Sequence, residues 1–284
     1  MWGWFRKAGN LAALLVAVTA GGAAADILDT IKERKVISIG HRVDAPPFSY
    51  VGEDGEPRGL AVALCREIVG SLARQIRLRE LDIRFVPVNA TSRFDALTSG
   101  KSDLHCGPAS ATLKRREMLD FSILYFVDGA AAVVRRSTYD TVFDIPNARI
   151  GVAASTTTET MVRTLIEDNG MSASVVTFPN HQLGLETLAR GRLDVYFGDS
   201  AIMRFQLTQR GLEPALELLP DTFSFEPYAI VMKRGESALR LAVDRALSEI
   251  YDSGLIYTLI QDTLGQYRLS PLNRAVYQIV GLPG

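Results

Sequence analysis

One sequence pattern occurs twice in this chain, and the duplication constrains the fold more than any other feature. The first copy covers residues 94–107 and the second covers 185–198, 91 positions further on. Each copy reads apolar, acidic, any, Leu, two variable, Gly, basic, any, Asp, aliphatic, two variable, Gly. This pattern is typical of an amphipathic helix, a glycine that ends it, and a short buried strand. The duplication therefore predicts two similar structural units.

Similar segments surround each copy of the pattern. Buried strands are expected at 35–40 and 149–153, amphipathic helices at 59–75 and 157–168, and second strands at 82–88 and 173–178. A strand at 228–234 and helices at 238–252 and 256–264 follow the second unit. Strands that alternate with helices predict an α/β fold with parallel sheets and helices on both faces.

The late strand and helices are expected to return and complete the first unit. Lobe 1 would then comprise residues 26–130 and 229–284, and lobe 2 would comprise residues 131–228. Two chain crossings, near 128–133 and 224–230, would join the lobes as a hinge. Ligands of such sheets bind beyond the carboxyl ends of the strands, so we expect a ligand cleft between the lobes.

The first 25 residues have the features of a secretory signal peptide. Arg6 and Lys7 are positive, residues 11–20 are apolar, and Ala23 and Ala25 occupy the small-residue positions before a cleavage site. A membrane anchor is the alternative, but the apolar run is shorter than the ~20 residues that a span needs. We expect the signal peptide to be removed and the rest of the chain to be exported.

Charge and cysteine content narrow the class of partner. The chain has 31 basic and 32 acidic residues, a balance that argues against binding of nucleic acid or of membrane surfaces. Its three histidines have no metal-ligand spacing, and we expect neither a metal nor a cofactor. An oxidising compartment would allow a disulfide between Cys65 and Cys106, and two unpaired buried cysteines are the alternative.

Three segments carry side chains suited to a small charged ligand. Residues 110–115 (SATLKR) follow the first repeated strand and begin a helix, whose N–H groups and Arg115 can hold a carboxylate. Residues 155–159 (STTTE) contain a capping-box pattern at the start of another helix. Asp199 follows the second repeated strand, where it can accept from an ammonium group. The alternatives are a solvated arginine, a plain helix cap and, at Asp199, an N-cap.

Several motifs are shared with a known family: Ile39-Gly40-His41-Arg42, Pro47-Phe48-Ser49-Tyr50, Ser92-Arg93-Phe94, Cys106-Gly107, Asp120-Phe121-Ser122 and Ser155-Thr156-Thr157. By these motifs the chain resembles the family-3 periplasmic solute-binding proteins, and within them the glutamate/aspartate receptors of ABC importers. The resemblance implies a periplasmic-binding-protein type II architecture, with two doubly wound lobes and a two-segment hinge. It also implies a periplasmic monomer that captures an amino acid and docks on a membrane permease and ATPase complex.

The resemblance further implies which residues hold the ligand's α-groups. It places the α-carboxylate at Arg115 with help from Ser110, and at the second helix N-terminus, formed by Ser155, Thr156 and Thr157. It assigns the α-ammonium to Asp199. Pro108 and Ala109 lack the hydroxyl groups common in the family, so lobe 1 is expected to make fewer contacts with these groups.

The ligand's side chain should be recognised by a cationic pocket of Arg42, Arg93 and His181. Basic-amino-acid binders of the family carry an acidic residue at the position of Arg42, so the charge is inverted here. For Arg93 and His181 the alternatives are a surface arginine and a helix cap. Phe48 is a candidate apolar wall for the ligand's carbon chain, with core packing as its alternative.

These features predict a receptor that closes around glutamate or aspartate, because cations in the cleft would outnumber one carboxylate, Asp199. A protonated His181 in contact with the ligand would make affinity fall as pH rises through the histidine range. A ligand sensor for a membrane signalling partner and a cyclohexadienyl-dehydratase-like enzyme are the alternatives. The enzyme would need a carboxylic acid with a raised pKa, for which Glu159 and Glu226 are the nearest candidates.

Overall fold

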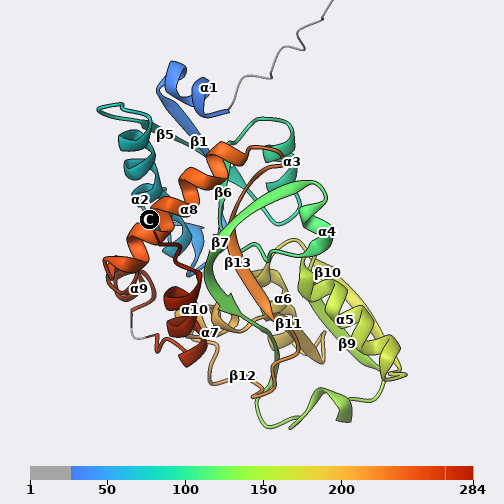
Figure 1. Cartoon of the computed structure of the whole chain (residues 1–284). Coiled ribbons are helices and arrows are strands. Elements are labelled where there is room, and N and C mark those ends of the chain that lie inside the picture. Colours follow the sequence, from blue (N-terminus) through green and yellow to red (C-terminus); the bar gives the residue numbers. More distant parts are fainter. Residues whose placement is uncertain (1–26, 266, 284) are drawn as a thin grey trace, which may run out of the picture.

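The computed structural model describes residues 27–265 and 267–283, which form two α/β lobes (Figure 1). The expected signal peptide, residues 1–25, lies outside the described residues. Within the described part of the chain, no helix has the length and apolar character needed to cross a membrane.

Lobe 1 is built on a five-stranded sheet with the order β5-β1-β6-β13-β7. Its strands are β1 (Val36–Arg42), β5 (Asp82–Val88), β6 (Leu104–Cys106), β7 (Leu119–Asp128) and β13 (Glu226–Lys233). β1 runs parallel to β5 and β6, whereas β13 is antiparallel to β6 and β7. A small sheet contacts β1 and consists of β2 (Asp44–Ala45), β3 (Ser49–Val51) and β4 (Pro57–Arg58).

Lobe 2 repeats this arrangement in a sheet with the order β10-β9-β11-β8-β12. Its strands are β8 (Ala130–Arg135), β9 (Ala148–Ala153), β10 (Ala173–Phe178), β11 (Val195–Asp199) and β12 (Leu216–Leu218). β9 lies parallel between β10 and β11, while β8 is antiparallel to β11 and β12. The expected parallel pairing is present between β1, β5 and β6 and between β9, β10 and β11, and each sheet adds antiparallel strands. The antiparallel pairings come from strands next to the chain crossings, which the repeated pattern does not include.

The repeated aspartate fixes the same strand pairing in both lobes. Asp103 donates its N–H to the carbonyl of Ser38 and accepts the N–H of Ser38 through Oδ2, both at 2.7 Å. Asp194 makes the same two bonds to Arg149, at 3.0 and 2.8 Å. Each aspartate thus joins the start of its repeated strand to the neighbouring parallel strand, β1 or β9.

Helices cover the two sheets (Figure 1). They are α1 (Ile27–Arg34), α2 (Leu60–Gln75), α3 (Arg93–Thr98), α4 (Leu113–Arg116), α5 (Thr157–Asp168), α6 (His181–Ala189), α7 (Ser200–Gln209), α8 (Ser237–Asp252), α9 (Leu255–Leu264) and α10 (Pro271–Val280), with a 3-10 turn, η1, at Val142–Asp144. α2 packs against α8 and α9, and α10 packs against β7. The late helices thus complete lobe 1.

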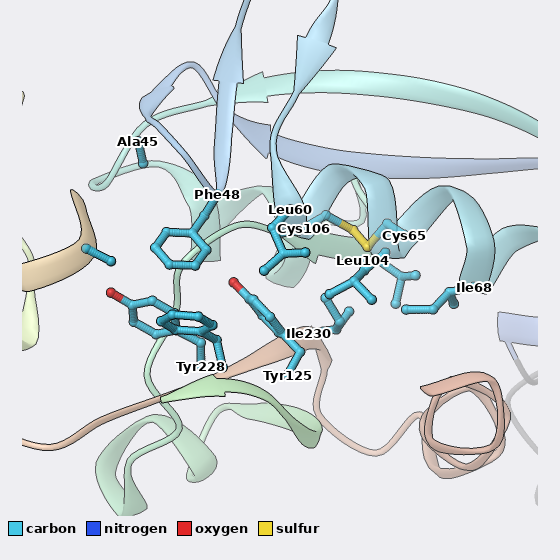
Figure 2. Packing of buried hydrophobic residues seen from close by; sticks show 14 of the residues in the cluster. Ala45, Phe48, Leu60, Cys65, Ile68, Leu104, Cys106, Tyr125, Tyr228 and Ile230 are labelled. Carbon is cyan, nitrogen blue, oxygen red and sulfur yellow. A yellow bond between two sulfur atoms is a disulfide. The ribbon is translucent and has the colours of Figure 1, made fainter. Parts of the chain in front are cut away.

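A disulfide ties the helical layer of lobe 1 to its sheet. Cys65 of α2 is bonded to Cys106 of β6, and both residues are fully buried. Figure 2 shows this bond within the apolar core, beside Leu104 and Ile68. The bond links the packing of α2 to the strand that precedes the candidate ligand site.

The lobes are joined by two neighbouring crossings. The first is at Gly129, between β7 and β8, and the second returns from β12 to β13, which begins at Glu226, before the expected boundary at 228/229. A Cβ on Gly129 would lie 2.4 Å from Thr222 Cγ2 and 2.6 Å from the carbonyl oxygen of Ser224. Glycine is needed there because the two crossing segments touch.

Candidate functional site

The lobes face each other across a cavity of about 20 Å³ at the ends of their strands. It is lined by Arg42, Arg93, Pro108, Ser110, Arg115, Thr156, Thr157, Thr158, His181, Asp199 and Ile202. This volume holds about one water molecule. Larger hollows of about 600 and 520 Å³ lie elsewhere on the described surface, but neither is lined by these strand ends. The structure thus brings most of the predicted site residues together.

Two predicted site residues do not line the cavity. Phe48 is fully buried in the lobe 1 core, with its ring centroid 4.8 Å from Phe126 and 5.2 Å from Tyr228 (Figure 2). Its core-packing alternative describes this position, because the segment after β2 turns the ring inward. Ser155 has an exposed side chain, and its carbonyl oxygen accepts a 3.1 Å hydrogen bond from Arg93 Nη2. That bond connects the two lobes.

Three arginines of lobe 1 converge on the cavity. Arg42 ends β1 and Arg93 begins α3, and only 3% and 2% of their surfaces are exposed. Arg42 Nε donates to Asp44 at 2.7 Å. Arg42 Nη2 and Arg93 Nε have no hydrogen-bond partner among the described residues. Burial, followed by the charges of Arg42 and Arg115, holds the pKa of Arg93 well below its usual range.

Two features of the first repeat position these arginines. The guanidinium carbons of Arg93 and Arg115 lie 4.3 and 5.1 Å from the ring centroid of Phe94, so both cations contact one aromatic ring. A Cβ on Gly107, the last glycine of the repeat, would lie 3.0 Å from Arg42 Cγ. Phe94 was not predicted as a site residue, although it directly follows Arg93 and is the first residue of the repeated pattern.

The site also contains more carboxylates than expected. Asp44 pairs with Arg42, and Glu226 is the largest opposite-charge influence on the pKa of Arg115, ahead of Asp199. Burial is the main influence and lowers that pKa. The predicted surplus of cations over one carboxylate is therefore wrong. Asp44 follows Arg42 by only two residues, whereas Glu226 is distant in sequence and reaches Arg115 only in the folded protein.

Asp199 occupies the N-cap position of α7 but makes no side-chain capping hydrogen bond there. Its carboxylate accepts from Thr158 Oγ1 at 2.9 Å and from the hydroxyl of Tyr228. Removal from water, and then the charge of Glu226, raises the pKa of Asp199 to about 6. Burial, and then Asp199, also raises the pKa of Asp128 at the end of β7. The part of the site next to the hinge therefore contains several carboxylates close to one another.

His181 lies in the cavity wall but is not a cation there. It is the first residue of α6, after the N-cap Asn180, and its Nδ1 lies 3.1 Å from the hydroxyl of Tyr196. Burial, and then the charge of Arg42, lowers the pKa of His181 to about 4. The expected cationic His181 is therefore wrong between pH 5 and 8, because the loss of solvation on burial and a neighbouring cation both disfavour its charge.

The start of α5 has the expected cap. Thr156 Oγ1 accepts from the N–H of Glu159 at 3.1 Å, and Glu159 Oε2 accepts from the N–H of Ser155 at 3.0 Å. Glu159 also pairs with Arg163 at 2.9 Å. The side chain of Glu159 therefore serves the cap and Arg163. Thr157 takes no part in these bonds, and its side chain faces the other lobe.

Glu226 is the main functional candidate that the sequence analysis did not assign to ligand binding. It is 2% exposed, and its Oε2 accepts from the hydroxyls of Ser110 and Thr157. Its partners Ser110 and Thr157 lie far from it in the sequence, so the sequence alone did not place Glu226 in the site.

Fold and site together define a two-lobe α/β binding protein whose ligand cavity lies between the lobes. Residues 37–266 match the bacterial extracellular solute-binding proteins, family 3. The match covers most of the chain, so the chain belongs to this family, as the sequence motifs predicted. Its fold is the type II periplasmic-binding-protein architecture.

Known relatives differ in what they bind. The L-glutamate/L-aspartate-binding protein of Pseudomonas aeruginosa is 27% identical over 246 residues, 86% of this chain and 82% of that protein. An ancestral arginine-binding protein bound to arginine matches with a TM-score of 0.74 at 26% identity, over 82% of this chain and 99% of that one. An ancestral amino acid-binding protein that is a precursor of cyclohexadienyl dehydratase has a TM-score of 0.73 at 22% identity, over 84% and 99%. That last likeness concerns the fold alone.

Proposed function

We propose that this protein captures an acidic amino acid, glutamate or aspartate, in the periplasm and delivers it to the permease and ATPase complex of an ABC importer. One observation carries the choice of ligand. The buried arginines Arg42 and Arg93 each keep an N–H group without a partner among the described residues, and both line the cavity. Leaving a buried cationic donor unpaired is costly. A carboxylate on the ligand's side chain would pair with both arginines.

The other groups suit the α-groups of an amino acid. Arg115 and the N-terminus of α5 offer donors to the α-carboxylate, and Asp199 offers an acceptor to the α-ammonium. An arginine ligand would bring its guanidinium towards Arg42 and Arg93, where like charges repel. The P. aeruginosa relative, named for glutamate and aspartate, supports the acidic choice.

The two lobes would move as rigid bodies about the crossings at Gly129 and just before Glu226, close to the expected boundaries at 130/131 and 228/229. A ligand that contacts both lobes favours the closed arrangement, because each added contact is lost on opening. The closed receptor, acting as a monomer, would then dock on the permease. The same closure would also serve a ligand sensor that acts on a membrane signalling partner. That role is the alternative function.

Binding without catalysis is the proposal, and it rests on how the acids of the site are used. Asp199, the cavity acid with a raised pKa, accepts from Thr158 and Tyr228 and is assigned to the ligand's ammonium. A dehydratase would need a protonated acid that faces its substrate. Glu159 is held by the α5 cap. Glu226 accepts three hydrogen bonds, from Ser110, Thr157 and Ser224, so both of its oxygens have partners within the protein.

The variant Arg93→Gln tests the side-chain assignment. It should weaken glutamate binding by about 10- to 100-fold, because one charge-assisted contact contributes about 1.5–3 kcal/mol. Glutamine binding should change much less, since its amide has no charge to lose. Titration calorimetry with both ligands measures the difference, with the exposed Arg190→Gln as control. Equal losses for glutamate and glutamine would contradict the assignment.

Affinity for glutamate should increase as pH rises from 5 to 7. The ligand ammonium needs ionised Asp199, whose pKa is raised to about 6, whereas His181, with its pKa near 4, stays neutral. Below pH 6 most Asp199 carboxyls are protonated and must release a proton before the ligand binds, whereas above pH 6 most are already ionised. The dissociation constant should therefore fall by about tenfold between pH 5 and pH 7. Calorimetry at pH 5, 6 and 7 measures this change. An affinity that falls with pH would instead indicate a protonated His181.

A further inference from the structure

Glu226 occupies an unusual place for a buried acid, because one of its oxygens is shared by the two lobes. It begins β13, directly after the chain returns to lobe 1. Its Oε2 accepts from Ser110, which follows β6 in lobe 1, and at 2.6 Å from Thr157, the first residue of α5 in lobe 2. Its Oε1 accepts from Ser224 in the hinge segment at 2.7 Å. The carboxylate therefore connects lobe 1, lobe 2 and the hinge.

The partners of Glu226 are the groups that a ligand's α-carboxylate would use under the proposed function. Ser110 and Thr157 line the cavity, and Glu226 acts on Arg115 as a nearby opposite charge. A hydroxyl has one proton to donate. Ser110 and Thr157 therefore cannot donate to Glu226 and to a ligand carboxylate at the same time.

The size of the cavity makes this competition unavoidable. A space of about 20 Å³ is far below the roughly 300 Å³ or more of typical ligand pockets. An amino acid can enter only when the lobes separate. Separation breaks the bond between Glu226 and Thr157, because the two residues belong to different lobes.

From these contacts we infer that Glu226 is a tethered competitor of the ligand's carboxylate. It holds the lobes together through Ser110 and Thr157, and the ligand replaces it at those hydroxyls when the receptor closes. Its carboxylate thereby lowers the affinity for the amino acid and determines how far the lobes open beforehand. The identity of the ligand rests on the proposed function, whereas the connection between the lobes does not.

Two variants, Glu226→Gln and Glu226→Ala, test this inference against the exposed control Glu80→Gln. Without amino acid, both Glu226 variants should have a larger radius of gyration by small-angle X-ray scattering than the wild type and the control. Saturating glutamate should return them to the wild-type value. Their dissociation constants for glutamate should fall by about tenfold, since a charge-assisted competitor has been removed.

An unchanged radius of gyration in both Glu226 variants would overturn the inference, as would weaker glutamate binding, which would make Glu226 a partner of the ligand's ammonium. Thermal denaturation confirms that each variant is folded before it is compared. If the wild type binds no amino acid, the proposed function fails. The scattering comparison still decides whether Glu226 holds the lobes together.

Discussion

Replacing Arg115 by lysine should weaken glutamate binding by about 100-fold or more. Arg115 Nη1 donates to the carbonyl of Ser110 at 2.8 Å, and its guanidinium lies over Phe94. These contacts hold a planar group that can offer two parallel N–H bonds to a carboxylate. Lysine keeps the charge but is a single point donor. Loss of about 3 kcal/mol of charge-assisted bonding corresponds to about 100-fold in affinity.

The neighbouring Arg116→Lys is the matched control, because Arg116 is on the same short helix and is exposed. It should bind glutamate with an affinity close to that of the wild type. Calorimetry on both variants, with thermal denaturation to verify folding, separates a lost contact from a lost fold. Wild-type affinity in Arg115→Lys would show that the α-carboxylate binds elsewhere.

Removing the disulfide should lower the free energy of unfolding by about 4 kcal/mol. The bond between Cys65 and Cys106 spans 41 positions of sequence, and a closed loop of this length restricts the unfolded chain by about that amount. Both residues are fully buried, so the variant Cys65→Ala/Cys106→Ala also loses some packing. Urea denaturation of the variant and the wild type measures the difference.

Reduction gives an independent control for the disulfide prediction. A reducing agent in the denaturant should lower the unfolding midpoint of the wild type and leave the double variant unchanged. Glutamate binding by the folded variant should persist, since neither cysteine lines the cavity. A double variant as stable as the wild type would refute the predicted contribution.

Local periodic patterns predicted much of the architecture. The expected helix 157–168 and strands 82–88 and 173–178 have the bounds of α5, β5 and β10, because amphipathic spacing and caps are encoded within each segment. The repeated motif likewise indicated two equivalent strands, which the structure contains as β6 and β11. Strands next to the crossings were harder to predict, since their antiparallel pairing depends on partners distant in sequence.

The charged residues of the site could be predicted only in part from the sequence. Arg42, Arg93, Arg115 and Asp199 could be predicted to line one cavity because each ends, follows or begins a recognisable element. Glu226 was interpreted only as a candidate acid, because its contacts with Ser110 and Thr157 exist only when both lobes and the hinge are assembled. The charge of His181 was predicted incorrectly for a related reason, since its pKa depends on burial rather than on neighbours in sequence.

Calorimetric titration of residues 26–284 with individual amino acids tests the central claim most directly. Glutamate, aspartate, glutamine, asparagine, arginine, lysine, histidine and cystine should be compared in one buffer at pH 7. The account predicts micromolar or tighter binding of glutamate or aspartate, with their amides weaker and the basic amino acids undetected. Micromolar binding of arginine, lysine or histidine without binding of glutamate or aspartate would contradict it.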